Sequence, residues 1–230
     1  MKKQVVLDLC SVQSQLAVAR RLTQAGNCEL AGVMISWGET PLEQICGDAE
    51  KPAAVYVGCP GPLARHLYQK NTGHAAVVQF PDCAQKEHAV AFLIRTCRSA
   101  EKPITIAALG PLTNIGMALR IAPDISGKIR KVVMVDTLQE DAFASKNLQM
   151  DPEAAQIAIH YGVALTIVQV AEDADLVGAL LWALEESNDS KGKQTHLQIC
   201  IDRGQAAGVL LCNPKRQPNA RIITEEVMNS

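Results

Sequence analysis

Short apolar runs rich in β-branched residues alternate with amphipathic segments along this chain. Most of the runs are apolar at consecutive positions, which is typical of parallel strands buried on both faces. Seven runs are predicted to be strands: Gln4–Asp8, Gly32–Ser36, Ala53–Val57, Ala75–Gln79, Ile104–Leu109, Lys131–Asp136 and Ala164–Val170. Their alternation with helices predicts an α/β fold of three layers, α/β/α, with a central, mainly parallel sheet.

The segments between the strands have apolar positions at helical spacing. The best-defined helix follows Asp151-Pro152, because aspartate favours the N-cap and proline favours the first helical turn. Its apolar face carries Ala154, Ile157, Ala158 and Tyr161. Two further helices are predicted from the faces formed by Val12, Leu16 and Ala19, and by Ala89, Phe92, Leu93 and Cys97.

The C-terminal part of the chain is less regular. Glu185–Gln194 is polar and contains a glycine, so an exposed loop is predicted. The apolar pattern over His196–Cys212 predicts one helix, and Arg221–Thr224 is predicted as a short strand. No repeat or domain boundary is visible, and residues 1–230 are therefore predicted to form a single domain.

Charge and composition narrow the classes of partner. The 22 Lys and Arg residues nearly balance 24 Asp and Glu residues, for a net charge of −2, and aromatic residues make up only 3%. Without a basic block or stacking aromatics, we expect neither nucleic acid nor a membrane as a partner. The apolar runs are far shorter than the roughly 18 residues of a transmembrane helix. The N-terminus lacks the features of a signal peptide, so a cytoplasmic location is expected.

Eight cysteines are spread widely: Cys10, Cys28, Cys46, Cys59, Cys83, Cys97, Cys200 and Cys212. The chain contains no Cys-x-x-Cys pair and no paired Cys/His spacing, so a zinc site is not expected. In a reducing compartment these cysteines are expected to be free thiols.

Two stretches carry specific motifs. Residues 104–115 read ITIAALGPLTNI, and residues 147–155 read NLQMDPEAA, followed at 162–168 by GVALTIV. Both resemble motifs of the inosine-uridine nucleoside hydrolase family, where they read alGPLTNiA and fNiyvDPeAA…sgipltlv. Residues 129–136, IRKVVMVD, are similar to the family strand i.rivvMGG, with Val135 and Asp136 in place of two glycines. The resemblance covers roughly residues 4–170.

This resemblance implies the nucleoside hydrolase fold, with a pocket at the C-terminal ends of the strands. It also implies a calcium ion that holds the ribose hydroxyls and a water, which an aspartate activates to break the N-glycosidic bond. Calcium requires six to eight oxygen ligands. The family supplies many of them from an N-terminal signature, DtDpGiDDa. The chain is shorter than a typical member, and we expect its C-terminal part to be reduced.

The signature is largely lost here. Asp8 keeps its first aspartate, but Cys10, Ser14 and Gln15 stand where the other three carboxylates are expected, including the base. The remaining metal candidates are Asp8 and the carbonyl of Leu112 or Thr113. Since neutral groups are poor ligands for calcium, we expect the calcium site to be lost and no cofactor to be bound. No catalytic residue is assigned.

Four residues are candidates for ligand contact: Asp8, Glu39, His74 and Asn147. Glu39 stands where the family has an asparagine that touches the sugar, and His74 aligns with a histidine before the fourth strand. Asn147 matches the sugar-binding asparagine, although Ser145 replaces the glutamate two residues before it. The late His-Asp pair of the family has no clear match near Asp202.

Several of these residues also have structural interpretations. Asp8 could cap a neighbouring helix, the GPLTN segment could serve only as a turn and a helix start, and Asp151 could serve only as a helix cap.

Three functional hypotheses follow. The first is a binding or regulatory homologue without calcium-dependent hydrolysis, with a nucleoside, ribose or protein partner. The second is an active N-ribohydrolase with an altered, metal-free site built on Asp8, Glu39 and His74. The third is a structural subunit that pairs with an active paralogue. The oligomeric state stays open, with a homo-oligomer as one option.

Overall fold

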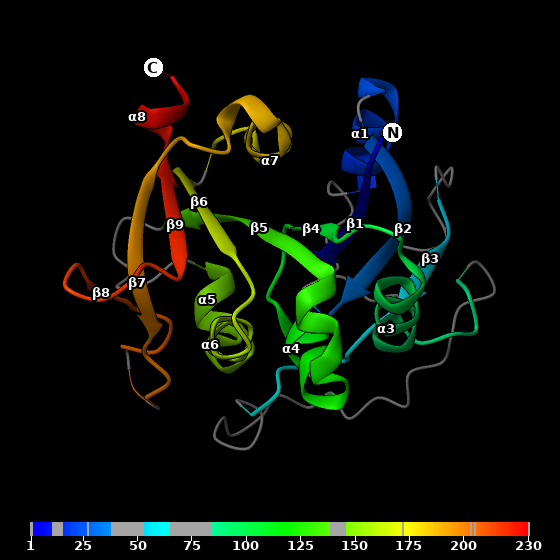
Figure 1. The fold of residues 1–230 in the computed structure, drawn as a ribbon, viewed down its shortest axis with the longest axis horizontal. Helices are drawn as coiled ribbons and strands as arrows, with labels where there is room; N and C mark the ends of the chain where they lie inside the picture. Colours follow the sequence, from blue (N-terminus) through cyan, green and yellow to red (C-terminus); the bar gives the residue numbers. More distant parts are fainter. Residues whose placement is uncertain are drawn as a thin grey trace.

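A nine-stranded sheet lies at the centre of the part of the chain that the computed structural model describes (Figure 1). That part comprises residues 2–10, 16–26, 28–37, 53–64, 84–138, 146–171, 173–202, 204 and 206–229. The strand order is β3-β2-β1-β4-β5-β6-β9-β7-β8. The strands are β1 Lys3–Cys10, β2 Cys28–Ser36, β3 Val55–Val57, β4 Ile104–Ala108, β5 Ile129–Leu138, β6 Leu165–Ala171, β7 Lys193–Ile199, β8 Leu210–Asn213 and β9 Ala220–Thr224.

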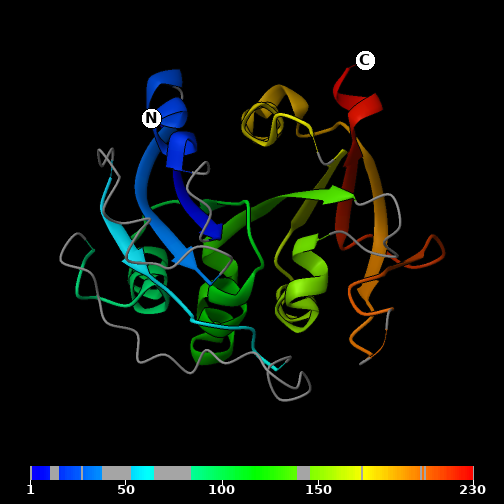
Figure 2. The same ribbon diagram turned by 180° about the vertical axis from the view of Figure 1, so that it is seen from behind.

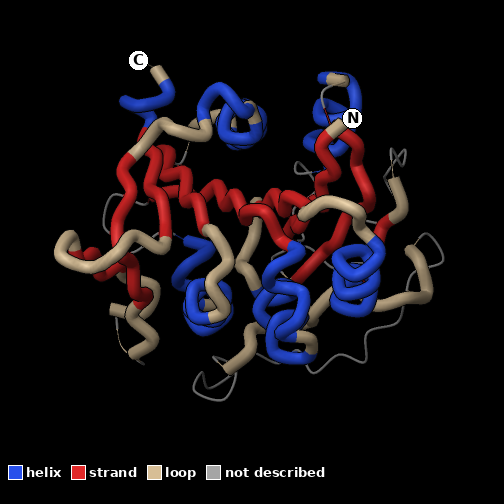
Figure 3. Tube along the Cα trace, viewed as in Figure 1, coloured by secondary structure: helices blue, strands red, loops and turns tan. Residues whose placement is uncertain are grey.

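Helices cover both faces of the sheet (Figure 3). One face packs against α1 (Leu16–Ala25) and α7 (Leu176–Leu184), and the other against α3 (Ala89–Ser99), α4 (Thr113–Ile121) and α6 (Pro152–His160). The short elements are η3 Pro123–Lys128, α5 Lys146–Met150, η4 Glu186–Asn188 and α8 Glu225–Met228. The pairs from β3 through β6 to β9 are parallel, whereas β7 is antiparallel to both β9 and β8. The predicted three-layer, mainly parallel architecture is confirmed.

Both ends of the described chain lie on the side of the sheet that carries α1 and α7 (Figure 2). No helix among the described residues is long and apolar enough to cross a lipid bilayer. Six cysteines are free thiols: Cys10, Cys28, Cys59, Cys97, Cys200 and Cys212. Cys46 and Cys83 lie outside the described residues.

The start of α6 follows from its sequence. The Asp151 side chain accepts a 3.1 Å hydrogen bond from the backbone N–H of Ala154, and Pro152 occupies the first turn. The predicted N-cap is confirmed, and the helix ends before Gly162, whose φ of 74° suits glycine. The strand predicted at 221–224 is confirmed as β9.

One predicted helix is wrong. His196–Cys212 contains most of β7, a turn and most of β8, paired antiparallel. Thr195, Leu197 and Ile199 are buried in alternation, which is the period of a strand with one face on the core. Gly208 has a φ of 82° and reverses the chain before β8. The loop predicted at 185–194 contains η4 and the first residues of β7. The strand predicted at 75–79 lies outside the described residues.

Candidate functional site

Asp8 lies near the carboxyl end of β1, beside the end of β4. β1 and β4 are parallel and pair Asp8 with Ala108, so the segment that follows β4 reaches the same sheet edge as Asp8. Open α/β sheets bind ligands at this edge. The Asp8 side chain is 1% exposed, and its Oδ1 accepts a 2.9 Å hydrogen bond from Asn114 Nδ2. Asp8 Oδ2 is buried without a hydrogen-bond partner among the described residues. Asp8 therefore carries one oxygen that a ligand could satisfy.

The Asn114 amide is held in place from both sides. Asn114 is buried in the first turn of α4, and its Oδ1 accepts a 2.8 Å hydrogen bond from the Cys59 backbone N–H. A Cβ at Gly58 would lie 2.2 Å from Asn114 Oδ1, so only glycine leaves room for this amide. The amide consequently presents its NH₂ group, a hydrogen-bond donor, to Asp8.

Burial raises the pKa of Asp8 from 3.8 to about 7, with the hydrogen bond from Asn114 opposing the rise. Asp8 is therefore close to half protonated at neutral pH. A carboxyl group in this state can donate or accept a proton near neutrality.

A second buried pair joins Thr113 to Asp151. Thr113 Oγ1 donates a 2.7 Å hydrogen bond to Asp151 Oδ2 and accepts one of 3.1 Å from Trp37 Nε1. Asp151 Oδ2 also accepts from the Leu63 N–H at 3.0 Å. Burial raises the pKa of Asp151, while these hydrogen bonds lower it. Asp151 thus acts as a helix cap that also holds residues 37, 63 and 113 around the site.

Asp136 organises the segment that carries Asn147. Asp136 Oδ1 accepts hydrogen bonds from the backbone N–H groups of Asn147 (2.8 Å) and Thr137 (3.0 Å). Its Oδ2 accepts from the N–H of Leu148 at 3.2 Å. Asn147 Nδ2 donates to the carbonyls of Leu109 (3.4 Å) and Val135 (3.3 Å). These contacts tie α5 to the ends of β4 and β5.

The structure brings four sequence-predicted residues to one sheet edge: Asp8, Leu112, Thr113 and Asn147. Glu39, His74, Ser14, Gln15 and Ser145 lie outside the described residues.

Asn114 and Asp136 belong to this network but are not among the sequence-predicted site residues. Asn114 is part of the GPLTN motif, for which the sequence leaves a purely structural role open. Asp136 was regarded only as a departure from the glycines of the family. An acidic residue in place of glycine at a strand end was the signal that could have identified it.

The described groups around Asp8 include few of the oxygen ligands that a calcium ion needs. No group of three or more His, Cys, Asp or Glu among them could hold a metal ion. Cys10 directs its thiol to the Leu109 carbonyl at 3.6 Å, the Leu112 carbonyl accepts from the Gly116 N–H at 2.8 Å, and Asn114 presents a donor. Among the buried acidic side-chain oxygens of the described residues, Asp8 Oδ2 alone has no hydrogen-bond partner, whereas calcium requires several oxygens.

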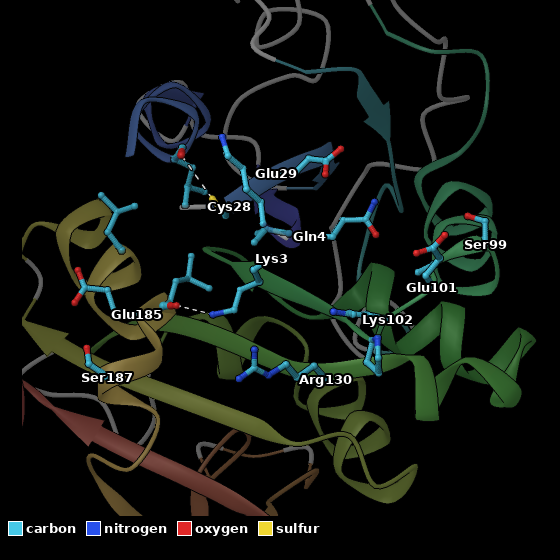
Figure 4. Close-up of a pocket in the computed structure, with 17 residues that line it drawn as sticks. Lys3, Gln4, Cys28, Glu29, Ser99, Glu101, Lys102, Arg130, Glu185 and Ser187 are labelled. Atoms are coloured by element: carbon cyan, nitrogen blue, oxygen red, sulfur yellow. Dashed lines mark hydrogen bonds between the residues drawn. The ribbon is translucent and has the colours of Figure 1, made fainter. Parts of the chain in front are cut away.

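Two cavities of the described part open at the opposite edge of the sheet, away from Asp8. The larger has a volume of about 1110 Å³ and is lined by the first residues of β1 and β2, together with Pro103 and Arg130 (Figure 4). Its charged side chains are mixed in sign, and Lys3 Nζ donates a 2.7 Å hydrogen bond to the Leu184 carbonyl. We locate the candidate site at Asp8 rather than in this cavity, because the buried polar network converges on Asp8.

Known proteins resemble this chain in sequence and in fold. The pyrimidine-specific ribonucleoside hydrolase RihB of Escherichia coli strain SE11 is 29% identical over 185 residues, which are 73% of this chain and 59% of RihB. The chain thus matches less than two thirds of the length of such curated relatives.

Solved structures show the same fold at low identity. The purine-preferring ribonucleoside hydrolase from Gardnerella vaginalis has a TM-score of 0.74 at 19% identity, covering 96% of this chain and 92% of that one. The inosine-uridine preferring nucleoside hydrolase from Bacillus anthracis has a TM-score of 0.70 at 16% identity, covering 97% and 94%. The family model "Inosine-uridine preferring nucleoside hydrolase" matches residues 10–205. The chain therefore belongs to the inosine-uridine preferring nucleoside hydrolase family.

Proposed function

We propose that this chain is a nucleoside hydrolase homologue that binds a nucleoside or another ribose-containing ligand without calcium-dependent hydrolysis, in a binding or regulatory role. One observation carries the proposal. Asp8 offers a single buried carboxylate oxygen without a partner among the described residues, its other oxygen accepts from the Asn114 amide, and Cys10, two residues farther along β1, carries a neutral thiol that points to the Leu109 carbonyl. Such a site favours a hydroxyl group over a divalent cation.

Ribose chemistry suits this site. A sugar hydroxyl can donate a hydrogen bond to Asp8 Oδ2 when Asp8 is ionised, and can accept one from it when Asp8 is protonated. The same hydroxyl can therefore bind both protonation states of Asp8. A buried polar atom without a partner costs about 1–3 kcal/mol. A ligand hydroxyl that satisfies Asp8 Oδ2 would recover part of that cost on binding. Asn114 and Asn147 are both held by backbone partners, which orders this edge of the sheet before the ligand arrives.

A second candidate function is metal-free hydrolysis of the N-glycosidic bond. It is favoured by the raised pKa of Asp8, about 7, which is suitable for general acid or base catalysis at neutral pH. Glu39 and His74 would be its further polar groups. Losing a positioned general base typically lowers rates about 10²- to 10⁴-fold, and the family base is one of the three carboxylates replaced here by Cys10, Ser14 and Gln15. We therefore rank this function second. The cytoplasmic location stays part of the same proposal.

A binding experiment tests the first function. Calorimetry with ribose, inosine and uridine should show binding to the wild-type chain, with affinity lowered about tenfold or more in Asp8→Ala, since the hydrogen bond to an ionisable partner is lost. Asp124→Asn is the matched control, because Asp124 is exposed and pairs with Arg98 on the surface, away from Asp8. No binding of any of the three compounds, or equal binding by Asp8→Ala, would refute the proposal.

A turnover experiment separates the two functions. The wild-type chain is incubated with inosine and uridine, with millimolar calcium or with EDTA, and free base and ribose are measured. The binding function predicts only trace release in both cases. Turnover in EDTA that Asp8→Ala abolishes would establish metal-free hydrolysis. Turnover that requires calcium would contradict both functions.

A further inference from the structure

A second cavity, of about 550 Å³, lies at the amino ends of β5, β6 and β9, at the opposite end of β5 from Asp136. The residues that line it are Arg130, Lys131, Gly162, Ala164, Leu165, Thr166, Asp189, Gln194, Pro218, Asn219, Ala220 and Arg221. Arg130 also lines the larger cavity, where its side chain is visible in Figure 4. This volume is within the range of small-molecule sites, about 300–1,000 Å³.

Three polar side chains of this cavity, Lys131, Thr166 and Arg221, lie on one face of the sheet. Val133 pairs with Thr166 and Thr166 pairs with Arg221 across three parallel strands, so these side chains point to the same side. Lys131 is two residues before Val133 and therefore shares that face. α7 covers the same face of the sheet closer to the carboxyl ends of the strands. Asp189, which follows η4, lines the cavity on this face.

Charge in the cavity is unbalanced. Three cations, Arg130, Lys131 and Arg221, line it together with a single anion, Asp189. Asp189 serves two of the cations: Oδ1 pairs with Lys131 Nζ, and Oδ2 accepts from Arg130 Nη2 at 2.9 Å. The Lys131 side chain is only 9% exposed, and Nζ also donates to the Ala183 carbonyl at 3.2 Å.

Arg221 is the third cation, and its Nε is buried with no hydrogen-bond partner among the described residues. A buried donor of this kind destabilises the folded state when it is left unsatisfied, and does so more when it is charged. The formal charges of the lining side chains sum to two positive units, from three cations and one anion. Both facts are explained if an anion occupies the cavity beside Arg221.

We infer that this cavity binds a phosphate-class oxyanion, with Arg221 as its main contact. A phosphate group carries about −1.5 to −2 charges at neutral pH, which matches the excess positive charge, whereas one carboxylate would leave part of it uncompensated. Guanidinium groups also match phosphate geometry with paired N–H donors. The volume leaves room for an organic group beyond the phosphate, so the source is either free phosphate or a phosphorylated small molecule. This site is independent of Asp8 and of the proposed nucleoside function.

Calorimetry with two probes tests the site: inorganic phosphate, and glycerol 3-phosphate as a ribose-free phosphomonoester that avoids the Asp8 site. Ionic strength is held constant with sodium chloride, and glycerol is the uncharged control. We expect phosphate-dependent binding and a rise in melting temperature, with no effect of glycerol. Tighter binding of the ester would indicate a phosphorylated small molecule, and equal or weaker binding would indicate free phosphate. Equal stabilisation by chloride alone would overturn the proposal.

Variants locate the binding. Arg221→Gln should lower phosphate affinity about tenfold or more, as expected for the loss of a charge-assisted hydrogen bond. Arg98→Gln is the matched control, since Arg98 pairs with Asp124 on the surface and lies outside the cavity, and its affinity should be unchanged. Asp189→Asn removes the competing anion and should raise phosphate affinity severalfold.

Asp189→Asn also leaves Lys131 without its carboxylate partner. The melting temperature of this variant without phosphate should therefore be lower than that of the wild type. Adding phosphate should raise the melting temperature of the variant more than that of the wild type. Arg221→Gln that folds, as judged by circular dichroism, and binds phosphate as tightly as the wild type would refute the assignment. Absence of any phosphate effect on Asp189→Asn would refute it independently.

Discussion

Asn114 donates a 2.9 Å hydrogen bond to Asp8, a buried contact between residues 106 positions apart in the sequence. It joins the end of β1 to the first turn of α4. The same amide accepts from the Cys59 N–H, which follows β3. One side chain therefore connects three strand ends, and its removal should disturb both stability and the titration of Asp8.

Asn114→Ala should lower the free energy of unfolding by about 2–4 kcal/mol, because it removes two buried hydrogen bonds and leaves polar groups unsatisfied. It should also raise the pKa of Asp8 above its present value of about 7, since the hydrogen bond that lowers it is lost. Urea denaturation measures the first effect, and a carboxyl NMR titration measures the second. A lowered pKa would contradict the arrangement.

Gly58→Ala tests the close approach of Asn114 to the backbone. On its own, this substitution should destabilise the protein by about 1–3 kcal/mol, as overpacking of a core does, because the new Cβ would lie 2.2 Å from Asn114 Oδ1. In the Asn114→Ala background the same change should cost much less, since the obstructing amide is gone. A double-mutant cycle by urea denaturation measures this coupling, and additive effects would show that the two residues do not compete for space.

The titration of Asp8 should make stability depend on pH. Between the unfolded pKa of 3.8 and the folded value of about 7, the folded state holds a proton that the unfolded state releases. The free energy of unfolding contributed by Asp8 therefore falls as pH rises through this window and is constant above it. The total fall is about 4 kcal/mol, from 1.36 kcal/mol per pKa unit.

Asp8→Asn isolates this effect from other titrating groups. The variant should match the wild type near pH 4 and exceed its stability at pH 8, because the neutral amide carries no buried charge. The comparison needs urea denaturation of both proteins across pH 4 to 8. A stability difference that does not change with pH would contradict the raised pKa of Asp8. If Asp8→Asn has a higher free energy of unfolding than the wild type at pH 8, the Asp8 carboxyl group destabilises the folded protein at that pH.

Asp136→Ala should loosen the start of α5. Asp136 accepts hydrogen bonds from three backbone N–H groups, those of Thr137, Asn147 and Leu148. Removing these acceptors should cost about 2–3 kcal/mol, as for other hydrogen bonds to charged groups. Hydrogen exchange of the Asn147 and Leu148 amides should accelerate. Asp136→Asn, which keeps one acceptor oxygen, should have a smaller effect, and equal effects of the two variants would argue against a role of the carboxylate.

Calcium should not stabilise the wild-type chain. Asp8 Oδ2 is the one buried acidic oxygen without a partner among the described residues, so millimolar calcium should leave the melting temperature unchanged. Restoring carboxylates with Cys10→Asp, Ser14→Asp and Gln15→Asp together should create a calcium-dependent rise in melting temperature, because a ligand that binds only the folded state stabilises it. We expect no turnover in this triple variant. Calcium-dependent stabilisation of the wild type would contradict the loss of the site.

The local sequence pattern determined the positions of most strands, the start of one helix and the family motifs. Runs of β-branched residues placed six of the seven predicted strands on β1 through β6, and Asp151-Pro152 fixed the start of α6. The GPLTN and DPEAA motifs led to the family. The loss of carboxylates at Cys10, Ser14 and Gln15 is also a property of the sequence alone. Such features depend on neighbouring residues, whose spacing a helix or strand fixes. The roles of Glu39 and His74 stay predictions.

The tertiary structure decided the contacts between distant segments. The pairing of Asp8 with Asn114, the hold of Asp136 on Asn147 and the cations around Asp189 join residues from different strands and helices. Polar residues of this kind can form hydrogen bonds with many different partners. The order of the strands in the sheet decides which partner lies within reach. The same reason explains the wrong helix at His196–Cys212. An apolar segment of that length is compatible with both the helical and the strand period. The strand forms because β7 pairs with β9, which lies farther along the chain and cannot be seen in the local pattern.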